Sequence, residues 1–384
     1  MGKDKLMNQE KLQSGRKEAI EGFAVDGTFR ECTSCGNGHI NDTYMMSFEK
    51  DGVIHRYSLQ HMNRSVFKDP VTLMNNILQV TDYLKEQIKK QGGDPQRETL
   101  DFVRAKTGEP YFIDSFGEYW RAYHYVEDAY ALEEVKNPQD FYESAVAFGR
   151  FQRMLADFPA DRLKETIEGF HDTKARFKAF EKAVEEDVCG RAAEVQKEIQ
   201  FVKDRYDVAC VLGDLLEAGE LPLRVTHNDT KSNNVLIDNA TGKGLCVIDL
   251  DTVMPGLAVN DFGDSIRFGA STGAEDEKDL TKVSCDLNLY DVYAKGFVEG
   301  CGGALTEMEI ECLPIGAKVM TYECGMRFLA DYLSGDTYFK IDYPTHNLDR
   351  TRTQLKLVWD MEQKWEEMQE IVRKYKLTHC LEKL

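Results

Sequence analysis

Three polar residues in the middle of this chain have the types and spacing that phosphoryl transfer requires. Asp229 and Asn234 lie five positions apart in HNDTKSNN, residues 227–234, and a second carboxylate, Asp249, follows in VIDLD. Such chemistry needs one carboxylate to orient or deprotonate an attacking hydroxyl, and oxygen ligands that hold Mg²⁺ at the phosphates of a nucleotide. We therefore expect Asp229 to act as the base, and Asn234 and Asp249 to hold the metal.

A β-hairpin is predicted to bring these groups together. The apolar runs VLID (235–238) and LCVI (245–248) are separated by the six turn-prone residues NATGKG, a pattern typical of a hairpin. In a symmetric pairing Asn234 faces Asp249 at the open end, where opposed Cβ atoms are about 5 Å apart. We expect the pair to share one cation, and Asp229 to enter the same end.

The alternative is an ordinary hairpin with surface Asp and Asn residues, because these residues favour turns for local hydrogen-bonding reasons. A solvated turn, however, does not need His, Asp and Asn on one edge together with a second acid that leaves an apolar strand at the matching position. The combination favours a functional site.

The N-terminal part of the chain is predicted to form a mostly antiparallel sheet with one helix across it. A polar helix comes first, and residues 27–63 then give three strands, of which the second runs from about His39 to Phe48 and is followed by a tight turn at Asp51 and Gly52. A helix with 3.6-residue periodicity follows at about 71–89, and two more strands are expected at about 100–106 and 118–126.

The remainder of the chain is predicted to be mainly helical. Helices are expected at 140–155, 165–180, 191–218, 277–299, 307–333 and 349–376, with the hairpin as the one island of strand. The predicted fold class is therefore α+β with two lobes: a tail over 1–24, a sheet lobe over 25–126 and a helical lobe over 127–384. We expect the hairpin to form the floor of a cleft between the lobes, and residues 127–129 to be the hinge.

The composition argues against several classes of partner. Lys and Arg number 48 and Asp and Glu 67, a net charge of −19, which disfavours nucleic acid and anionic membranes. No apolar run approaches the roughly 18 to 20 residues of a membrane span. The N-terminus lacks the apolar core of a signal peptide, and Leu6 occupies the position where a myristoylation signal has Ser or Thr. A cytosolic protein is expected.

The ten cysteines are scattered through a long chain, so reduced thiols are expected rather than a disulfide scaffold. Cys32 and Cys35 form a CxxC pair with His39 nearby. A zinc site needs about four ligands and no second pair is evident, which favours packing as the role of these cysteines.

Six segments resemble the aminoglycoside phosphotransferase and choline kinase superfamily, a branch of the protein-kinase-like fold, and more closely the N-acetylhexosamine 1-kinases. The matching segments are GHINDTY (38–44), YSLQHMN (57–63), FGRFQRMLADFP (148–159), THNDTKSNNVLID (226–238), VIDLDTVMPG (247–256) and DFGDSIR (261–267). The similarity extends over about residues 22–370.

The resemblance implies a role for each matching residue. Asp229 is the catalytic base, and Asn234 and Asp249 are the Mg²⁺ ligands. The expected ATP-binding residues are Gly36, Gly38, Asn41, Thr43, Gln60 and Glu127, the expected acceptor-binding residues are His39, Arg327 and Tyr338, and the expected supporting residues are His227, Asp251 and Asp264. Asp264 resembles the buried Asp that braces the catalytic loop. Asp251 would point to the same side as Asp249 in a continuing strand.

Two positions depart from the usual kinase pattern. The third strand normally supplies a Lys to the phosphates, yet Gln60 occupies its place; the next helix normally supplies a Glu, yet it offers Asn75, Asn76 and Gln79. The absence of the Lys explains the absence of the Glu, because a Glu without its Lys partner would be an uncompensated charge. A catalytically silent pseudokinase is the alternative, and the intact catalytic trio argues against it.

The leading hypothesis is ATP-dependent phosphorylation of the anomeric hydroxyl of an N-acetylhexosamine. A kinase of an amino alcohol, choline or an aminoglycoside is the second, and a nucleotide-binding protein without turnover is the third. Arg327 is expected to bind the acceptor because it lies in a largely apolar helix. The alternative for Arg327 is a structural ion pair with Glu323, one turn earlier.

Overall fold

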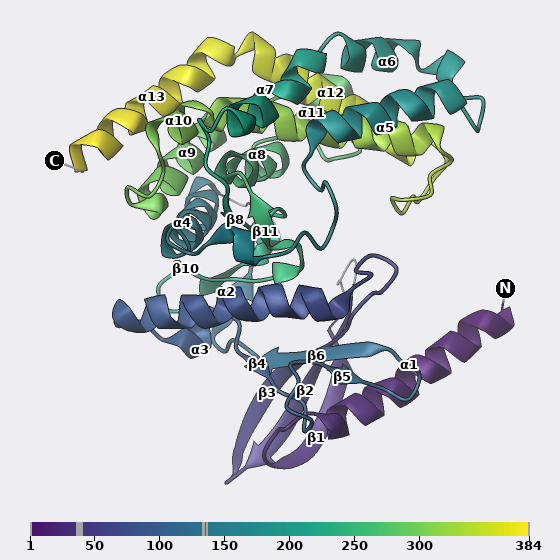
Figure 1. Cartoon of the computed structure of the whole chain (residues 1–384), viewed down its shortest axis with the longest axis vertical. Coiled ribbons are helices and arrows are strands. Elements are labelled where there is room, and N and C mark those ends of the chain that lie inside the picture. Colours follow the sequence, from purple (N-terminus) through teal and green to yellow (C-terminus); the bar gives the residue numbers. More distant parts are fainter. Residues whose placement is uncertain (1, 36–40, 133–134, 136, 383–384) are drawn as a thin grey trace. The chain divides into compact units, whose positions relative to one another are not determined.

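The computed structural model describes residues 2–35, 41–132, 135 and 137–382 (Figure 1). The chain divides into two compact units, Met1–Ala129 and Tyr130–Leu384. The first is built on an antiparallel sheet and the second mainly on helices, which confirms the predicted fold class.

The sheet of the first unit has six strands in the order β1-β2-β3-β6-β4, with β5 paired to β6, and every pairing is antiparallel. The strands are β1 (Thr28–Ser34), β2 (Asp42–Lys50), β3 (Val53–His61), β4 (Phe102–Val103), β5 (Phe112–Ile113) and β6 (Tyr119–His124). Asp51 and Gly52 join β2 to β3 with φ angles of 53° and 78°, as a two-residue hairpin turn requires.

Some details of this sheet differ from expectation. Strand β2 begins at Asp42 among the described residues, and its expected start at about His39 lies outside them; β4 spans two residues of the expected 100–106. The turn-rich stretch after β4 contains β5, whose Phe112 pairs with Trp120. Tertiary pairing, which local propensity does not report, sets these strand lengths.

Helix α1 (Gly2–Gly22) covers one face of the sheet with an apolar cluster. Ala19 and Phe23 pack with Tyr44, Leu59 and the fully buried Trp120. Alternation along the strands places the neighbouring positions on the other face. Helix α2 (Pro70–Lys90) begins where Asp69 accepts the backbone N–H of Thr72, and α3 (Pro95–Glu98) follows it. Figure 1 shows α1 and α2 on different sides of the sheet.

The second unit contains more helix breaks than the sequence suggests. The helices are α4 (Pro138–Met154), α5 (Thr173–Glu186), α6 (Gln196–Lys203), α7 (Tyr206–Glu217), α8 (Ala258–Gly269), α9 (Leu287–Cys301), α10 (Glu307–Glu311), α11 (Leu313–Leu333), α12 (His346–Gln363) and α13 (Trp365–Glu382). The segments expected as single helices at 191–218, 307–333 and 349–376 are each two helices. Pro314, at the start of α11, accounts for one break because it favours a helix start.

Two helices begin later than predicted because Asp side chains cap them. Asp172 accepts the N–H of Ala175 at the start of α5, and Asp286 accepts those of Asn288 and Leu289 at the start of α9. The residues before the first cap form turns and bends, and those before the second include the short 3-10 helix Leu280–Lys282, instead of the predicted α-helix.

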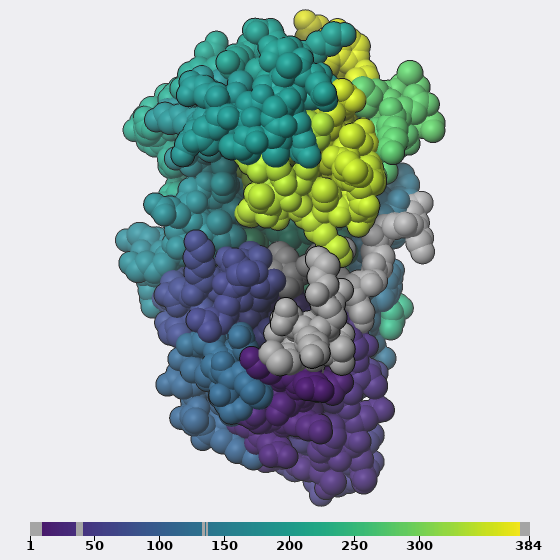
Figure 2. Space-filling model, turned by 90° about the vertical axis from the view of Figure 1, so that its right-hand side faces the viewer, coloured from purple at the N-terminus to yellow at the C-terminus, as the bar shows by residue number. Residues whose placement is uncertain are grey.

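Helix α11 lies in the core of this unit, where Tyr322, Met326 and Leu329 pack against residues from α5, α6, α7 and α12. Figure 2 shows the teal part of the chain beside the yellow-green part. Helices α6 and α12 are in contact there, and Arg352 Nε on α12 donates to Glu198 on α6 at 2.7 Å. Within the described residues, no helix is long and apolar enough to cross a membrane. The cysteines with described side chains are all free, as expected.

The second unit contains further β-strands besides the hairpin, contrary to the prediction. Strands β9 (Val235–Asp238) and β10 (Gly244–Val247) pair as predicted, but β7 (Ala129–Ala131) joins β9 on its other side. A further pair, β8 (Arg224–Thr226) and β11 (Met254–Gly256), flanks the loop of residues 227–234. This loop is therefore held between two small sheets.

The predicted register of the hairpin is wrong by one residue. Val247, not Ile248, pairs with Val235, because the register shifts between Gly244 and Cys246, as a β-bulge does by adding an unpaired residue to one strand. Ile248 consequently pairs with Asn234, and its N–H donates to the Asn234 carbonyl at 2.9 Å.

Asp249 lies one position beyond that pair. It has a φ of 59°, and the chain then enters the short 3-10 helix Leu250–Thr252. The expectation that Asp251 continues a strand on the same side as Asp249 is therefore wrong, and Asp251 is buried.

Candidate active site

The loop of residues 227–234, named here the catalytic loop, is held by a carboxylate of α8. Asp261 Oδ2 accepts the N–H of His227 at 2.9 Å, and Asp261 Oδ1 accepts that of Asn228 at 2.8 Å. Gln152 Nε2 donates to the same carboxylate at 2.8 Å. Burial raises the pKa of Asp261, although His227, Asn228 and Gln152 act in the opposite direction. The sequence analysis gave this residue no role.

Asp264, one turn later, holds the next part of the loop. Its Oδ2 accepts the Thr230 N–H at 2.9 Å, and its Oδ1 accepts Arg267 Nη2 at 2.9 Å. Burial alone would raise the pKa of Asp264, but Arg267 outweighs burial and the pKa is lowered. Arg267 also pairs with Glu275 at 3.1 Å. Asp264 therefore holds the backbone of the catalytic loop at Thr230.

The backbone of the catalytic loop adopts an uncommon conformation just before the proposed base. Asn228 has a φ of 64°, and such residues cluster at sites where the surrounding structure fixes them. Its Nδ2 donates to the Thr252 carbonyl at 2.8 Å, and its Oδ1 accepts the Thr226 hydroxyl at 2.9 Å. These two bonds fix the direction in which the chain enters Asp229.

One oxygen of Asp229 is held by two donors. Lys231 Nζ lies 3.2 Å from Asp229 Oδ2, and Asn234 Nδ2 lies 3.3 Å from the same atom. Within the described part of the chain, Asp229 Oδ1 has no hydrogen-bond partner. The arrangement fixes the carboxylate and leaves Oδ1 to meet a hydroxyl group.

The His227 side chain holds the backbone at Asp229 in place. Its Nε2 donates to the Ile248 carbonyl at 2.9 Å, and its Nδ1 accepts the Asp229 N–H at 3.3 Å. The ring is fully buried, with Phe148 and Phe151 against it. His227 therefore connects the catalytic loop to the end of β10.

Asn234 and Asp249 carry the kind of oxygen atoms that Mg²⁺ prefers as ligands. Asn234 Nδ2 also donates to the Asp229 carbonyl at 2.8 Å, so its amide orientation is set and Oδ1 faces away from that bond. Asp249 is exposed and follows the residue paired with Asn234. Among the residues that the structure describes, no three His, Cys, Asp or Glu side chains cluster around a possible metal position. Two oxygen ligands completed by water and phosphate are typical of Mg²⁺ sites.

Lys231 is a site residue that the sequence analysis missed. Burial would lower its pKa, but Asp229 outweighs this effect and the pKa is raised, with smaller contributions from Asp264 and Asp249. Lys231 therefore stays charged beside the proposed base. The sequence shows a Lys two positions after Asp229, but it does not show that this side chain points toward the Asp229 carboxylate.

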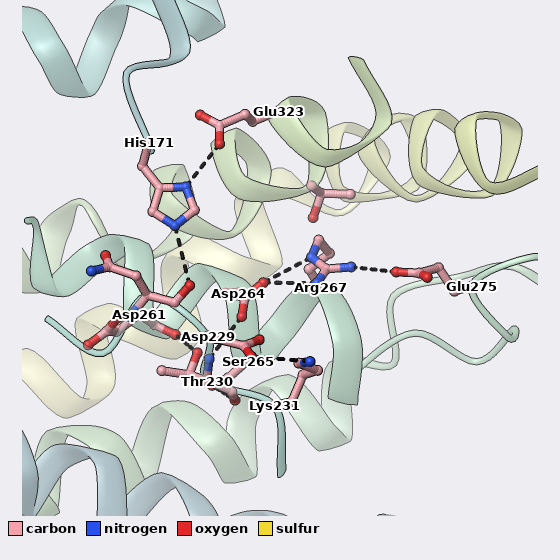
Figure 3. Close-up of polar contacts among 12 residues, drawn as sticks. His171, Asp229, Thr230, Lys231, Asp261, Asp264, Ser265, Arg267, Glu275 and Glu323 are labelled. Carbon is pink, nitrogen blue, oxygen red and sulfur yellow. Dashed lines mark hydrogen bonds and ion pairs between the residues drawn. The ribbon is translucent and has the colours of Figure 1, made fainter. Parts of the chain in front are cut away.

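A second missed residue, His171, links the catalytic loop to α11. Its Nδ1 lies 2.9 Å from Glu323 Oε1, and its Nε2 lies 3.5 Å from the Asn228 carbonyl (Figure 3). Thr173 donates to the other oxygen of Glu323 at 2.6 Å. Burial would raise the pKa of Glu323, but His171 and these bonds outweigh it and the pKa is lowered.

Arg327, one turn after Glu323 on α11, is surrounded by aromatic rings. Its guanidinium carbon lies 5.6 Å from the ring centre of Phe170, 5.8 Å from that of Tyr338 and 5.5 Å from that of Phe339. Within the described residues, Arg327 has no hydrogen bond or ion pair to another side chain. The two oxygens of Glu323 accept from His171 and Thr173 instead of from Arg327, although the charge of Arg327 contributes to the lowered pKa of Glu323.

Tyr338 reaches Arg327 because a buried carboxylate folds its loop. Asp331 accepts the backbone N–H groups of Thr337, Tyr338 and Phe339 at 2.9, 2.8 and 3.0 Å. Tyr338 itself is 63% exposed. Its surface is thus available to a ligand beside Arg327.

A second guanidinium lies near this group. Burial lowers the pKa of Arg176, and the charge of Arg327 lowers it further. Arg176 Nη2 donates to the Phe170 carbonyl at 3.2 Å. The region around Arg327 is therefore positively charged and partly aromatic.

Comparison with known proteins agrees with the chemistry of this loop. The model of the phosphotransferase enzyme family matches residues 31–294, well over half of the chain. The chain belongs to that family. This phosphotransferase is therefore an enzyme, as the sequence predicts, and the matched region includes the catalytic loop and Asp249.

Solved structures share the fold of this phosphotransferase at low sequence identity. An aminoglycoside phosphotransferase from Alicyclobacillus acidocaldarius has a TM-score of 0.57 at 13% identity, with 94% of this chain and 96% of that chain covered. Choline kinase from Cryptosporidium parvum has a TM-score of 0.54 at 12% identity, covering 90% and 93%. Spectinomycin phosphotransferase in complex with ADP and spectinomycin has a TM-score of 0.53 at 11% identity, covering 92% and 98%.

The expected nucleotide-binding residues of this phosphotransferase lie in the first unit. Gln60 lies between Thr43 and Arg121 in the sheet, bonded to both. Asn41 accepts the Asn63 N–H at 2.9 Å. Glu127 accepts Arg56 Nε at 2.9 Å, within an ion pair. Three further residues given roles by the sequence lie outside the described residues, namely Gly36, Gly38 and His39.

Proposed function

We propose that this phosphotransferase transfers the γ-phosphoryl group of ATP to the anomeric hydroxyl of an N-acetylhexosamine, such as GlcNAc or GalNAc, and releases the sugar 1-phosphate and ADP. The family supports phosphoryl transfer. The similar structure that contains ADP supports a nucleotide as the donor. The acceptor is argued from the residues around Arg327.

The observation that carries the proposal is the environment of Arg327. A half-buried guanidinium has five N–H donors, and those of Arg327 meet three aromatic rings instead of acceptors in the described structure. A ligand with carbonyl and hydroxyl oxygens satisfies such donors, and its apolar face can pack on the rings. An acetamido sugar has both features.

The same residues disfavour the cationic acceptors of related enzymes. Choline and aminoglycosides carry positive charge, which Arg327 and Arg176 repel. Glu323 lies nearby, but its oxygens accept from His171 and Thr173. A cationic acceptor is best held by carboxylates or by aromatic rings without a resident cation. The geometry therefore favours a neutral, hydrogen-bonding acceptor.

The catalytic loop supplies the groups for the transfer. The acceptor oxygen forms a bond to the γ-phosphorus as the bond between that phosphorus and the bridging oxygen of ADP breaks. Asp229 Oδ1 takes the hydroxyl proton, while Lys231 and Asn234 hold Oδ2. Asn234 and Asp249 would hold a Mg²⁺ ion, whose chemistry is the neutralisation of phosphate charge.

A coupled ADP-release assay tests the proposal against its competitors. The purified protein is supplied with MgATP and, in turn, GlcNAc, GalNAc, glucose, choline, ethanolamine and an aminoglycoside. We expect release with the two acetamido sugars to exceed release with each cationic acceptor by at least about 100-fold in kcat/KM, a difference typical of buried polar recognition. A preference for choline or an aminoglycoside would overturn the acceptor assignment. No release with any acceptor would favour a protein without turnover.

A further inference from the structure

Four charged side chains of alternating sign form a row between the catalytic loop and residues 335–341, named here the acceptor loop because it carries Tyr338. In order from the catalytic loop they are Asp264, Arg267, Glu275 and Arg350. Figure 3 shows the first three, in which Arg267 pairs with Asp264 at 2.9 Å on one side and with Glu275 at 3.1 Å on the other. We call these four side chains the charge row.

One end of the charge row holds the backbone beside the proposed base. Asp264 accepts the N–H of Thr230 at 2.9 Å, and Thr230 follows Asp229 directly in the chain. Arg267 is 10% exposed, and its Nε and Nη2 donate to the same Asp264 oxygen at 3.1 and 2.9 Å. A displacement of Arg267 would therefore move the carboxylate that holds Thr230.

The other end of the charge row holds the acceptor loop. Arg350 Nη1 donates to the Lys340 carbonyl at 3.1 Å, and the guanidinium carbon of Arg350 lies 5.4 Å from the ring centre of Phe328. The Phe328 ring packs on that of Phe339, with the ring centres 4.6 Å apart. Arg350 therefore supports both the backbone of the acceptor loop and one of the aromatic rings around Arg327.

Glu275 is the member of the charge row that both arginines share. Its Oε1 accepts Arg267 Nη1 at 3.1 Å, and its Oε2 lies 3.6 Å from Arg350 Nε. That nitrogen is buried and makes no hydrogen bond within the described part of the chain. The Arg350 side chain is 18% exposed, and a guanidinium at such a position needs a nearby negative charge. Glu275, which lies between α8 and α9, supplies it.

We propose that Glu275 is a positioning residue, which fixes the acceptor loop relative to the proposed base Asp229. It does so by pairing with Arg267 and Arg350 at the same time. The inference rests on the proposed function, because it takes the sugar to be bound by the acceptor loop. Phosphoryl transfer requires the hydroxyl group within hydrogen-bond reach of the base, and a misplacement of about 1 Å can cost 10²-fold in rate.

Steady-state kinetics of Glu275→Gln with MgATP and with GlcNAc or GalNAc test the proposal. The amide keeps the shape of the side chain but removes the charge that the two arginines share. We expect kcat to fall and the KM for the sugar to rise, for a loss of about 3- to 30-fold in kcat/KM. The KM for ATP should stay within about twofold, because the nucleotide is not held by the acceptor loop.

Glu198→Gln is the matched control. Glu198, on α6, also pairs with an arginine of α12, Arg352, at 2.7 Å, and its side chain is more buried than that of Glu275. The variant therefore removes an ion pair of the same kind from the same helix without changing the charge row. We expect kcat and both KM values to stay within about twofold of the parent.

A double variant separates positioning through one connected row from two independent effects. Arg350→Met should lower kcat/KM for the sugar at least as much as Glu275→Gln, because it also removes the contact with Lys340. The combination of the two should be no worse than about twofold below the weaker single variant, since the second change removes a link that is already broken. If these variants do not fold, Arg350→Lys replaces them, with an expected loss of about threefold for the sugar and none for ATP.

Four results would overturn the inference: an unchanged kcat/KM for the sugar, equal changes in the KM for sugar and ATP, losses that add in the double variant, or an equal loss in Glu198→Gln. A parent protein that phosphorylates neither sugar would instead contradict the proposed function. The two failures are therefore distinguishable in the same assay.

Discussion

Lys231 Nζ lies 3.2 Å from Asp229 Oδ2, the oxygen that Asn234 also contacts. Asp229 Oδ1 is thereby the oxygen that is left for the proposed acceptor. A base of this kind must be fixed in direction as well as present, because proton transfer needs hydrogen-bond geometry in the reacting complex. The predictions below follow from this relationship and from the surroundings of Arg327.

Asp229→Asn should reduce kcat by about 10² to 10⁴, the usual contribution of a general base. The amide keeps the shape of the side chain but cannot take the proton, so MgATP affinity should stay within about threefold. Steady-state kinetics and calorimetry measure the two effects. Asp157→Asn, an exposed carboxylate of the same unit, is the matched control. A variant within about threefold of the parent in kcat would remove Asp229 from the role of base.

Asn234→Ala and Asp249→Ala should both weaken nucleotide binding in the presence of Mg²⁺. The effect should be larger for Asp249, because its loss removes a negative ligand from a hard cation. Titration of ATP with Mg²⁺ and with EDTA checks this, and both variants should resemble the parent when EDTA is present. Equal affinity of the Asp249 variant and the parent with Mg²⁺ would exclude Asp249 as a ligand.

Arg327→Ala should raise the KM for the acetamido sugar by about tenfold or more, and Tyr338→Phe should raise it less, with the KM for ATP nearly unchanged in both. The reason is that Arg327 has donors to offer a ligand, whereas Tyr338 is exposed at 63% and contributes mainly ring surface. Arg162→Ala removes an exposed cation–π contact with Phe158 and is the control. Equal losses for sugar and ATP would point to a structural role of Arg327.

Asp264→Asn should destabilise the enzyme by about 3 to 5 kcal/mol near pH 7, the cost of leaving one charge of a buried ion pair without its partner. The pKa of Asp264 is lowered from its ordinary value of 3.8, so its contribution is present above about that pH and is lost as the pH falls through the lowered value. Urea unfolding at neutral and acidic pH measures this. The gap between variant and parent should be constant down to about pH 5 and narrow below about pH 4. A gap that widens in acid would contradict the ion-pair assignment.

The sequence predicted the elements of the site better than their exact pairing. The hairpin and the antiparallel sheet follow from short apolar runs and turn residues, which are local signals. The register at Asn234 could not be predicted from these local signals, because the pairing shifts by one residue beyond Gly244, as in a β-bulge. The trio could therefore be named, but Asp249 is displaced by one position from the predicted pair.

Other contacts depend on tertiary structure and were not predictable from spacing. Asp261 follows the catalytic loop by more than 25 residues in the sequence, yet it accepts two of the loop's backbone N–H groups. His171 contacts the loop from the turn before α5. This turn lies within the predicted helix 165–180, whose first residues are not helical.

Phosphorus NMR of the reaction mixture tests the central claim most directly. The protein is incubated with MgATP and GlcNAc or GalNAc, and the position of the new phosphate is read from its coupling to the sugar protons. The account predicts a phosphate coupled to the anomeric proton, formed at a rate that falls by about 10² or more in Asp229→Asn. A phosphate on another hydroxyl group, or ADP formation with cationic acceptors and none with either sugar, would contradict it.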